Sequence, residues 1–252
     1  MKKKLDWKRI YATNLKLGLS KVIKGIDYSR IVEYPLAFSQ LEFGKNDLIL
    51  DVGSSDSVFP VFLASLGHTV HAIDIDSKVL KLERYANELK ILNLTVAIQD
   101  ITKLLYPDNF FDKITVISAI EHVLPVEDGD VRAIGEIART LRAGGQAIVT
   151  VPCSDEFEVK ESRSKTGRNF SLIRRYDKTA MRERLVKPSG LYLANQIFFG
   201  ESVEFSKIWY KTPFSAFSFP APIFARLFMH FGDIKKPQGV CLKLRKHNGE
   251  GF

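Results

Sequence analysis

The fold of this chain is decided by residues 48–57, which read LILDVGSSDS, together with residues 71–76, which read HAIDID. An apolar run turns sharply at Gly53 into a helical pattern over residues 57–66. A glycine ends that pattern, and a second apolar run ends on Asp74. This order predicts a strand, a tight turn, a helix and a second strand whose last residue is acidic.

A unit of this kind predicts a cofactor site. In a right-handed βαβ unit both strand ends point to the same edge of the sheet, where a nucleoside can lie across the first turn. Asp74 follows Gly53 at the spacing, about 20 residues, that lets an acid bind both ribose hydroxyls.

The charge of the turn distinguishes two classes of cofactor. A dinucleotide places its pyrophosphate against the helix N-terminus, which bare glycine backbone normally provides. Here the turn carries Asp56, a negative charge where the phosphates would lie. S-adenosylmethionine has no phosphate and carries a sulfonium cation, so the acidic turn favours S-adenosylmethionine over a dinucleotide.

Length and composition indicate one α/β domain with terminal extensions. In a chain of 252 residues we expect an N-terminal helical extension or lid over residues 1–45 and the main domain over residues 46–252. Cys153 and Cys241 lie too far apart in sequence for a disulfide framework or a metal cluster, which favours a reducing compartment. Neither a signal core nor an apolar run of membrane-spanning length is recognisable, so we expect a cytoplasmic protein.

The net charge of +8 is concentrated in two segments, residues 1–24 and residues 160–187. One interpretation is that these basic side chains lie on solvated helix faces and a loop. The other is that they bind an anionic substrate or surface, such as a phosphorylated molecule, nucleic acid or acidic lipid. The sequence leaves both open.

Strands and helices alternate along the rest of the domain. Helical patterns are expected at residues 77–92 and 128–142, and strands at residues 95–99, 114–117 and 146–151. This alternation predicts a Rossmann-like, doubly wound α/β sheet that is mostly parallel, with helices on both faces.

Six short motifs occur in order along the chain, and together they carry a family resemblance. They are LDVG at 50–53, AID at 72–74, QD at 99–100, PDNFFD at 107–112, IEHV at 120–123 and LRAGG at 141–145. In this order and spacing, the chain resembles a class I S-adenosylmethionine-dependent methyltransferase over roughly residues 46–200. The resemblance also implies that residues 191–199 and 240–244 form a closing antiparallel pair of strands.

The resemblance implies a role for each matching cofactor-site position. Asp51 and Gly53 would flank the methionine part of the cofactor. Asp74 would take the ribose hydroxyls, and Ile75 would lie against the adenine. The remaining positions follow the third and fourth strands: Asp100 would accept from the adenine amino group, Ile101 would supply a backbone or apolar contact, and Ser118 would line the methyl-transfer end.

The chain departs from the family pattern at Ser55 and Ser57, where glycines are expected. A serine hydroxyl can cap a helix or meet the cofactor carboxylate, so Ser55 is counted with the cofactor site. Serine also restricts the positive φ angles that glycine accepts freely. Weaker cofactor binding, or a non-catalytic descendant of the fold, therefore stays an alternative.

His122 is the catalytic candidate, because an unperturbed histidine titrates near neutral pH. It would act as a general base, or it would lie beneath the site with Glu121 as a hydrogen-bond partner. Some relatives place a metal-binding acid three residues before this pair, where this chain has Ser118. We therefore expect no metal.

The resemblance predicts methyl transfer by in-line displacement, with S-adenosylhomocysteine as product. Residues 118–122 lack the Asn/Asp-Pro-Pro-Tyr pattern typical of amide and exocyclic nitrogen methylation. We expect a small or medium-sized acceptor of anionic or partly apolar character. The alternatives are a non-catalytic S-adenosylmethionine-binding module, or an enzyme acting on RNA or a protein side chain.

Two segments of the C-terminal third are expected to govern the acceptor. Residues 153–187 read as a basic mobile loop and helix over the site. Residues 203–237 form an aromatic insert between the last two strands, interpreted as a hydrophobic cap, an apolar acceptor pocket, a dimer contact or a membrane-surface element. Nucleic acid is disfavoured because no RNA-binding module is recognisable, and the oligomeric state is not predicted.

Overall fold

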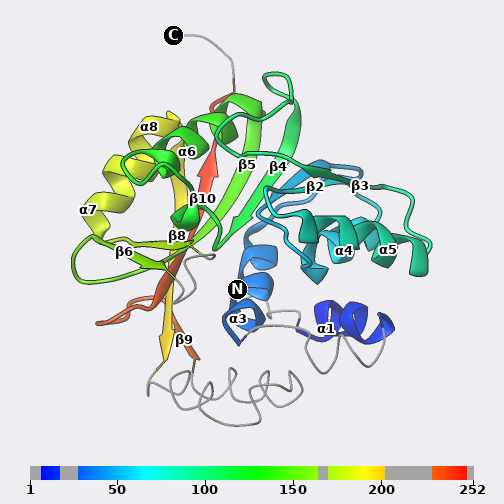
Figure 1. Ribbon diagram of the computed structural model, residues 1–252, viewed down its shortest axis with the longest axis horizontal. Coiled ribbons are helices and arrows are strands. Elements are labelled where there is room, and N and C mark those ends of the chain that lie inside the picture. Colours follow the sequence, from blue (N-terminus) through cyan, green and yellow to red (C-terminus); the bar gives the residue numbers. More distant parts are fainter. Residues whose placement is uncertain (1–6, 18–27, 164–169, 202–228, 249–252) are drawn as a thin grey trace.

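A computed structural model describes residues 7–17, 28–163, 170–201 and 229–248. Its main feature is an eight-stranded sheet with strand order β3-β2-β1-β4-β5-β10-β8-β9 and helices on both faces (Figure 1). The mostly parallel, doubly wound α/β fold predicted from the sequence is therefore confirmed.

Five parallel strands form the half of the sheet that carries the predicted motifs. In sheet order they are β3 (Leu94–Ile98), β2 (Thr69–Asp74), β1 (Leu48–Val52), β4 (Phe111–Ile117) and β5 (Leu141–Pro152). Strand β4 is buried along its whole length, as expected for a strand covered by helices on both faces. The connecting helices are α4 (Val58–Ser65), α5 (Lys81–Glu88) and α6 (Gly129–Thr140).

The other half of the sheet is antiparallel. Strand β10 (Gly239–Arg245) lies between β5 and β8 (Tyr192–Glu201) and runs antiparallel to both. Strand β9 (Met229–Phe231) pairs with β8 at the edge. The closing antiparallel pair of strands is thus confirmed.

Two apolar cores lie on opposite faces of the sheet. One face packs against α3 (Tyr28–Gln40), α4 and α5, and α1 (Trp7–Lys16) packs on α3 and α4. The other face packs against α6 and a helical segment made of α7 (Lys178–Ala180), η3 (Met181–Val186) and α8 (Lys187–Ser189). Helix α3 lies over β4, β5 and β10, so part of the expected N-terminal extension belongs to the core.

The structure differs from the sequence prediction at residues 153–187. On either side of the centre of the expected loop it has β6 (Glu158–Arg163) and β7 (Phe170–Arg175), which pair as an antiparallel hairpin. Along β7, Leu172 and Arg174 are buried while Ile173 points outward, the alternation of a strand. Residues 164–169, at the centre of the expected loop, lie outside the described residues, so its mobility and its place over the site stay predictions.

Other element bounds shift by a few residues. Helix α6 ends at Thr140, and residues 141–145 begin β5 rather than closing the helix. The expected helix at 77–92 is a short 3-10 turn, η1 (Ser77–Leu80), followed by α5. Most of the aromatic insert, residues 202–228, lies outside the described residues, so its roles stay predictions. Within the described residues, no helix has the length and apolarity needed to cross a membrane.

Candidate functional site

A cavity of about 380 Å³ opens at the carboxyl ends of β3, β2, β1 and β4. Its size is that of a small-molecule site, and its place is where open α/β sheets bind ligands. The structure brings eight of the nine predicted site residues into its wall: Gly53, Ser55, Asp74, Ile75, Asp100, Ile101, Ser118 and His122.

The turn after β1 admits only glycine at position 53. Gly53 has a φ of +72°, and a Cβ built there would lie 2.2 Å from the Cβ of Ala119. The backbone amides of Gly53 and Ser54 both donate to the carbonyl of Ile73, at 2.9 and 3.0 Å. These bonds hold the turn against β2. Because residue 53 has no side chain, its backbone itself lines the cavity.

The two serines in glycine positions behave differently. Ser55 adopts a φ of +45°, the left-handed region that costs a side-chain-bearing residue about 1 kcal/mol. Ser57 instead caps α4, accepting from the amide of Phe59 at 3.0 Å, and its hydroxyl lies 2.8 Å from the hydroxyl of Tyr34. The turn thus accommodates one serine by a left-handed backbone and the other as a helix cap.

Asp74 ends β2 with its carboxylate directed across this turn. One oxygen accepts from the amide of Ser55 and the other from the amide of Asp76, both at 2.8 Å. Each carboxylate oxygen has a second lone pair, so both remain able to accept a ribose hydroxyl. Ile75, next in the chain, is 72% exposed and offers an apolar surface beside it.

Asp51 is the predicted residue that does not line the cavity. It is buried below the turn, where its carboxylate accepts from the hydroxyls of Thr115 at 2.5 Å and Ser54 at 2.7 Å. Burial raises the pKa of Asp51 to about 6, although both hydrogen bonds oppose that rise. Asp51 therefore supports the turn from beneath, and its contact with the cofactor stays a prediction.

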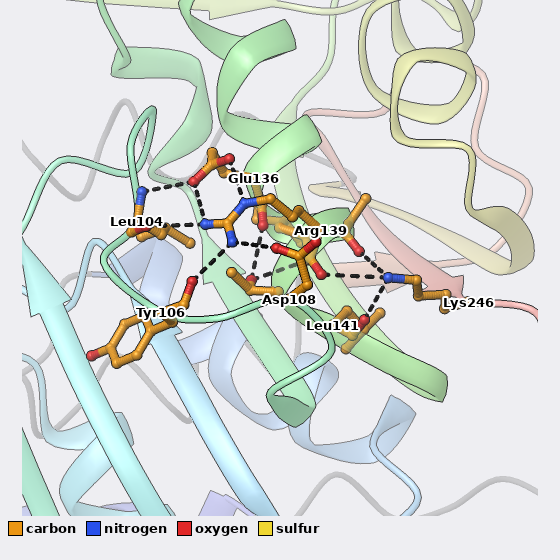
Figure 2. A network of polar contacts seen from close by, with 10 residues as sticks. Leu104, Tyr106, Asp108, Glu136, Arg139, Leu141 and Lys246 are labelled. Carbon is orange, nitrogen blue, oxygen red and sulfur yellow. Dashed lines mark hydrogen bonds and ion pairs between the residues drawn. The ribbon is translucent and has the colours of Figure 1, made fainter.

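The β3 end of the cavity is fixed by an arginine that sequence reasoning missed. Asp100 accepts from both the amide and the hydroxyl of Thr102 at 2.8 Å, and the chain then passes under Arg139 of α6. Figure 2 shows Arg139 donating to the carbonyls of Leu104 and Tyr106, at 3.0 and 2.9 Å. Its ion pairs with Asp108 and Glu136, at 2.7 and 2.8 Å, complete the clamp on this loop.

At the β4 end, α3 contributes residues that the sequence did not indicate. Arg30 lines the cavity, pairs with Glu33 at 2.6 Å and donates to the carbonyl of Ser118 at 3.0 Å. Ser118 has a φ of +41°, and its hydroxyl donates to Glu33 at 2.5 Å. The spacing of Arg30 and Glu33, three residues apart in a helical pattern, was visible in the sequence. Their partner Ser118, however, lies 85 residues beyond Glu33.

His122 lies in the short 3-10 helix η2 (Ile120–His122), and a strand of the hairpin fixes its ring. Its Nδ1 lies 2.5 Å from the carbonyl of Leu172, which can only accept, so Nδ1 carries the proton. Nε2 of the neutral ring then keeps its lone pair. Burial lowers the pKa of His122 below its usual value near 6.5.

Glu121 is not the hydrogen-bond partner that the sequence suggested for His122. Its Oε1 lies 3.7 Å from Nε2 of His122, beyond hydrogen-bond distance. Glu121 is buried, and Oε2 has no hydrogen-bond partner among the described residues. Burial raises the pKa of Glu121 to about 8, so this side chain is mostly uncharged at neutral pH.

A second buried arginine attaches the hairpin to the cavity wall. Arg174 of β7 has 0% exposure and donates to the carbonyls of residues 121, 123, 125 and 126 at 2.7–3.3 Å. Asp130, at the start of α6, lies 3.5 Å from its Nε and also binds Tyr176 and Arg184. The segment after β4 therefore depends on β7 for its position.

Comparison with known proteins agrees with this geometry. Residues 50–149 match the family model of the methyltransferase domain. This part of the chain is a methyltransferase domain with the class I fold. The family resemblance read from the six motifs is confirmed.

Relatives of the methyltransferase domain extend the comparison. The ubiquinone/menaquinone biosynthesis C-methyltransferase UbiE of Hydrogenovibrio crunogenus is 30% identical over 108 residues, which are 41% of each chain. A crystal structure of a SAM-dependent methyltransferase from Methanosarcina mazei has a TM-score of 0.60 at 17% identity, covering 85% of this chain and 98% of that one. A Burkholderia thailandensis 1,6-didemethyltoxoflavin-N1-methyltransferase, solved with bound 1,6-didemethyltoxoflavin and S-adenosylhomocysteine, has a TM-score of 0.57 at 16% identity, covering 94% of this chain and 89% of that one.

The methyltransferase domain fits S-adenosylmethionine by its donor set as well. The cavity has a carboxylate with free lone pairs beside the turn and an exposed apolar side chain next to it, and its described lining residues form no phosphate-binding cluster of cations. The comparisons support the same cofactor. Among the described residues, no group of three or more histidine, cysteine or acidic side chains is arranged to hold a metal.

Proposed function

We propose that this chain binds S-adenosylmethionine in the cavity and transfers its methyl group to a small or medium-sized acceptor of anionic or partly apolar character. The observation that carries the proposal is the convergence of Asp74, Asp100 and Ser118 on one cavity from the ends of β2, β3 and β4. The acceptor bound by the Burkholderia thailandensis neighbour supports a small molecule.

The order of the strands supports the following arrangement of the cofactor. Asp100 and Ile101 follow β3, so they would contact the adenine, with Ile75 against its face. Asp74 ends β2 and would accept from the ribose hydroxyls. The methionine part would then cross the turn at Gly53 and Ser55, towards Ser118 at the end of β4.

His122 is proposed as the proton acceptor for an acceptor group that arrives protonated. The bound cofactor supplies a methyl group activated by a sulfonium, and its transfer needs alignment more than acid–base help. When the nucleophile carries a proton, Nε2 of His122 has the free lone pair to take it. The lowered pKa keeps that lone pair available at neutral pH.

The test is calorimetric titration with S-adenosylmethionine and S-adenosylhomocysteine. We expect micromolar binding by the wild-type protein and roughly tenfold or greater weakening in Asp74→Asn, because the amide nitrogen cannot accept from a ribose hydroxyl. Asp76→Asn is the matched control, since Asp76 is a neighbouring acid that caps η1 and does not line the cavity. Failure of the wild-type protein to bind either ligand would contradict the proposal.

Turnover distinguishes an enzyme from a binding module. With cofactor binding established, mixtures of candidate acceptors would be screened for release of S-adenosylhomocysteine. Binding with no release from small molecules, RNA or proteins would favour the non-catalytic alternative.

A further inference from the structure

The loop that carries His122, residues 121–126, curls around the side chain of Arg174 in β7. Nη1 of Arg174 donates to the carbonyls of residues 121 and 123, at 3.3 and 2.8 Å, which flank His122 in the chain. Nη2 donates to the carbonyls of residues 125 and 126, at 2.7 and 2.8 Å. Arg174 has 0% exposure and is not among the described lining residues of the cavity, so it contacts this loop from outside the cavity.

The shape of the loop depends on the guanidinium of Arg174. Four carbonyl oxygens converge on it, and its two terminal nitrogens supply an N–H group for each of them in one plane. Each buried carbonyl left without a donor would cost about 1–3 kcal/mol. Without this side chain the carbonyl oxygens would also repel one another, so the loop would open until water reached them.

The same strand also fixes the ring of His122. Leu172 lies two residues before Arg174 in β7, and its carbonyl oxygen is 2.5 Å from Nδ1 of His122. Strand β7 therefore holds the backbone around His122 through one side chain and the imidazole through one carbonyl. A shift of the loop by about 1 Å would take Nδ1 out of hydrogen-bond range of that carbonyl. Which nitrogen of His122 carries the proton thus depends on where Arg174 holds the loop.

Arg174 is anchored by Asp130 at the start of α6. Its Nε lies 3.5 Å from Oδ1 of Asp130, and both side chains have 0% exposure. Asp130 also accepts from the hydroxyl of Tyr176 at 2.9 Å and from Arg184 at 2.6 Å. These two partners stay when Arg174 is replaced, so the substitution leaves no unpaired carboxylate buried under the loop.

We propose that Arg174 is the positioning residue of His122: it holds the loop so that Nδ1 donates to the carbonyl of Leu172 and Nε2 keeps its lone pair. The inference deepens the proposed function and rests on it, because His122 is the proton acceptor named there. Arg174 acts through the backbone of the loop, since the described cavity wall contains His122 and not Arg174. A base whose free nitrogen is fixed before the acceptor binds needs no change of tautomer during the reaction.

The experiment follows the tautomer of His122 by NMR of protein with isotope-labelled histidine, without any ligand. We expect a ring protonated on Nδ1 in the wild-type protein. In Arg174→Ala the main form should become the Nε2-protonated one, which predominates in free histidine. Arg139→Ala is the matched control, because Arg139 also donates to two carbonyls and pairs with two acids, but at the β3 end of the cavity. It should lose stability and keep the wild-type tautomer of His122.

Chemical rescue separates positioning from folding. Arg174→Ala leaves space for a free guanidinium ion beside the carbonyls of the loop, and this ion should restore the Nδ1-protonated ring at concentrations far below those that denature proteins. Potassium chloride at the same ionic strength should not restore it. If a thermal melt shows that Arg174→Ala does not fold, Arg174→Lys takes its place. The lysine keeps the charge but has fewer N–H donors than the loop has carbonyls, so both tautomers of His122 should appear.

The outcomes distinguish the inference from the proposed function. An unchanged Nδ1-protonated ring in the folded Arg174 variant would overturn the inference. The same change of tautomer in Arg139→Ala would overturn it too, as would restoration by potassium chloride equal to that by guanidinium. Failure of the wild-type protein to bind S-adenosylmethionine or S-adenosylhomocysteine would instead contradict the proposed function, whichever tautomer the NMR spectra show for His122.

Discussion

The two ends of the cavity are built from different parts of the chain. The β3 end uses the loops after β1, β2 and β3, which all lie within residues 53–101. The β4 end joins Arg30 of α3, Ser118 and His122 after β4, and the carbonyl of Leu172 in β7. One end is therefore a contiguous βαβ unit, whereas the other depends on contacts between segments up to 88 residues apart.

The two ends should therefore differ in which substitutions they tolerate. The β3 end is fixed by local turns and by the clamp of Arg139, so its geometry should survive changes elsewhere in the fold. The β4 end is fixed by α3 from one side and by Arg174 of β7 from the other. Substitutions far from the cavity in sequence should therefore act on the methyl-transfer end first.

The largest expected effect comes from a substitution of Gly53, because the turn after β1 packs there against Ala119 after β4. Gly53→Ala places a Cβ 2.2 Å from that of Ala119 at a φ of +72°, so we expect a loss of about 3–4 kcal/mol in unfolding free energy, and of cofactor binding. Gly67→Ala is the control, because Gly67 has a φ of +96° with nothing within 4 Å of the added carbon. It should cost about 1 kcal/mol in a denaturant titration. Equal losses would show that the contact with Ala119 is unimportant.

The two ends should respond to pH with opposite signs. Burial raises the pKa of Glu121 to about 8 from an unfolded value near 4.5, so folding retains a proton that the unfolded chain releases, and stability falls as pH rises from 4.5 to 8. Glu121→Gln removes this dependence and should gain stability over wild type across that range. The hydrogen bond from Arg139 lowers the pKa of Glu136, so its contribution is present above pH 4.5 and is lost as pH falls below it.

Melting temperatures from pH 4 to 9 would measure both slopes. Glu136→Gln should be less stable than wild type at pH 7 and approach it in acid, the reverse of Glu121→Gln. Parallel pH profiles for the two variants would show that the two ends do not differ in this way.

The two serines of the turn should give smaller effects of opposite sign. Ser55→Gly relieves a positive φ and should stabilise the protein by about 0.5–1 kcal/mol. Ser57→Ala removes the cap of α4 and the hydrogen bond to Tyr34, and should destabilise it by about 1–2 kcal/mol. Chemical denaturation of the two variants side by side tests this. A destabilised Ser55→Gly would mean that its backbone strain is compensated by contacts of its side chain.

The smallest expected effect is a shift in the titration of His122. Because burial lowers the pKa of this ring, its NMR titration midpoint should lie below 6.5, and its nitrogen shifts should report the Nδ1-protonated form. His122→Gln identifies the signal by its loss. A midpoint above 6.5, or a ring protonated on Nε2, would remove the basis for its role as proton acceptor.

The contrast between the two ends also explains which parts of the fold and of the cavity could be predicted from the sequence. Gly53, Asp74 and Asp100 each follow a recognisable strand at a spacing set by the βαβ unit, so both the fold and this end of the cavity could be predicted. Arg30 and Arg174 reach the site through tertiary contacts that leave no periodic signal. Arg174 is one of several basic residues in its segment, and its four carbonyl partners are visible only in the folded chain.

The position of β10 between β5 and β8 has a consequence for how this protein folds. Strands β8 and β9 are made earlier in the chain but join the main sheet only through β10, so the sheet is continuous only after residues 239–245 have inserted. Until then β5 and β8 both present unpaired edges, which are templates for aggregation. Pairing of strands that lie far apart in the sequence is slow. The time until β10 inserts would therefore be the period during which the newly made chain needs protection from aggregation.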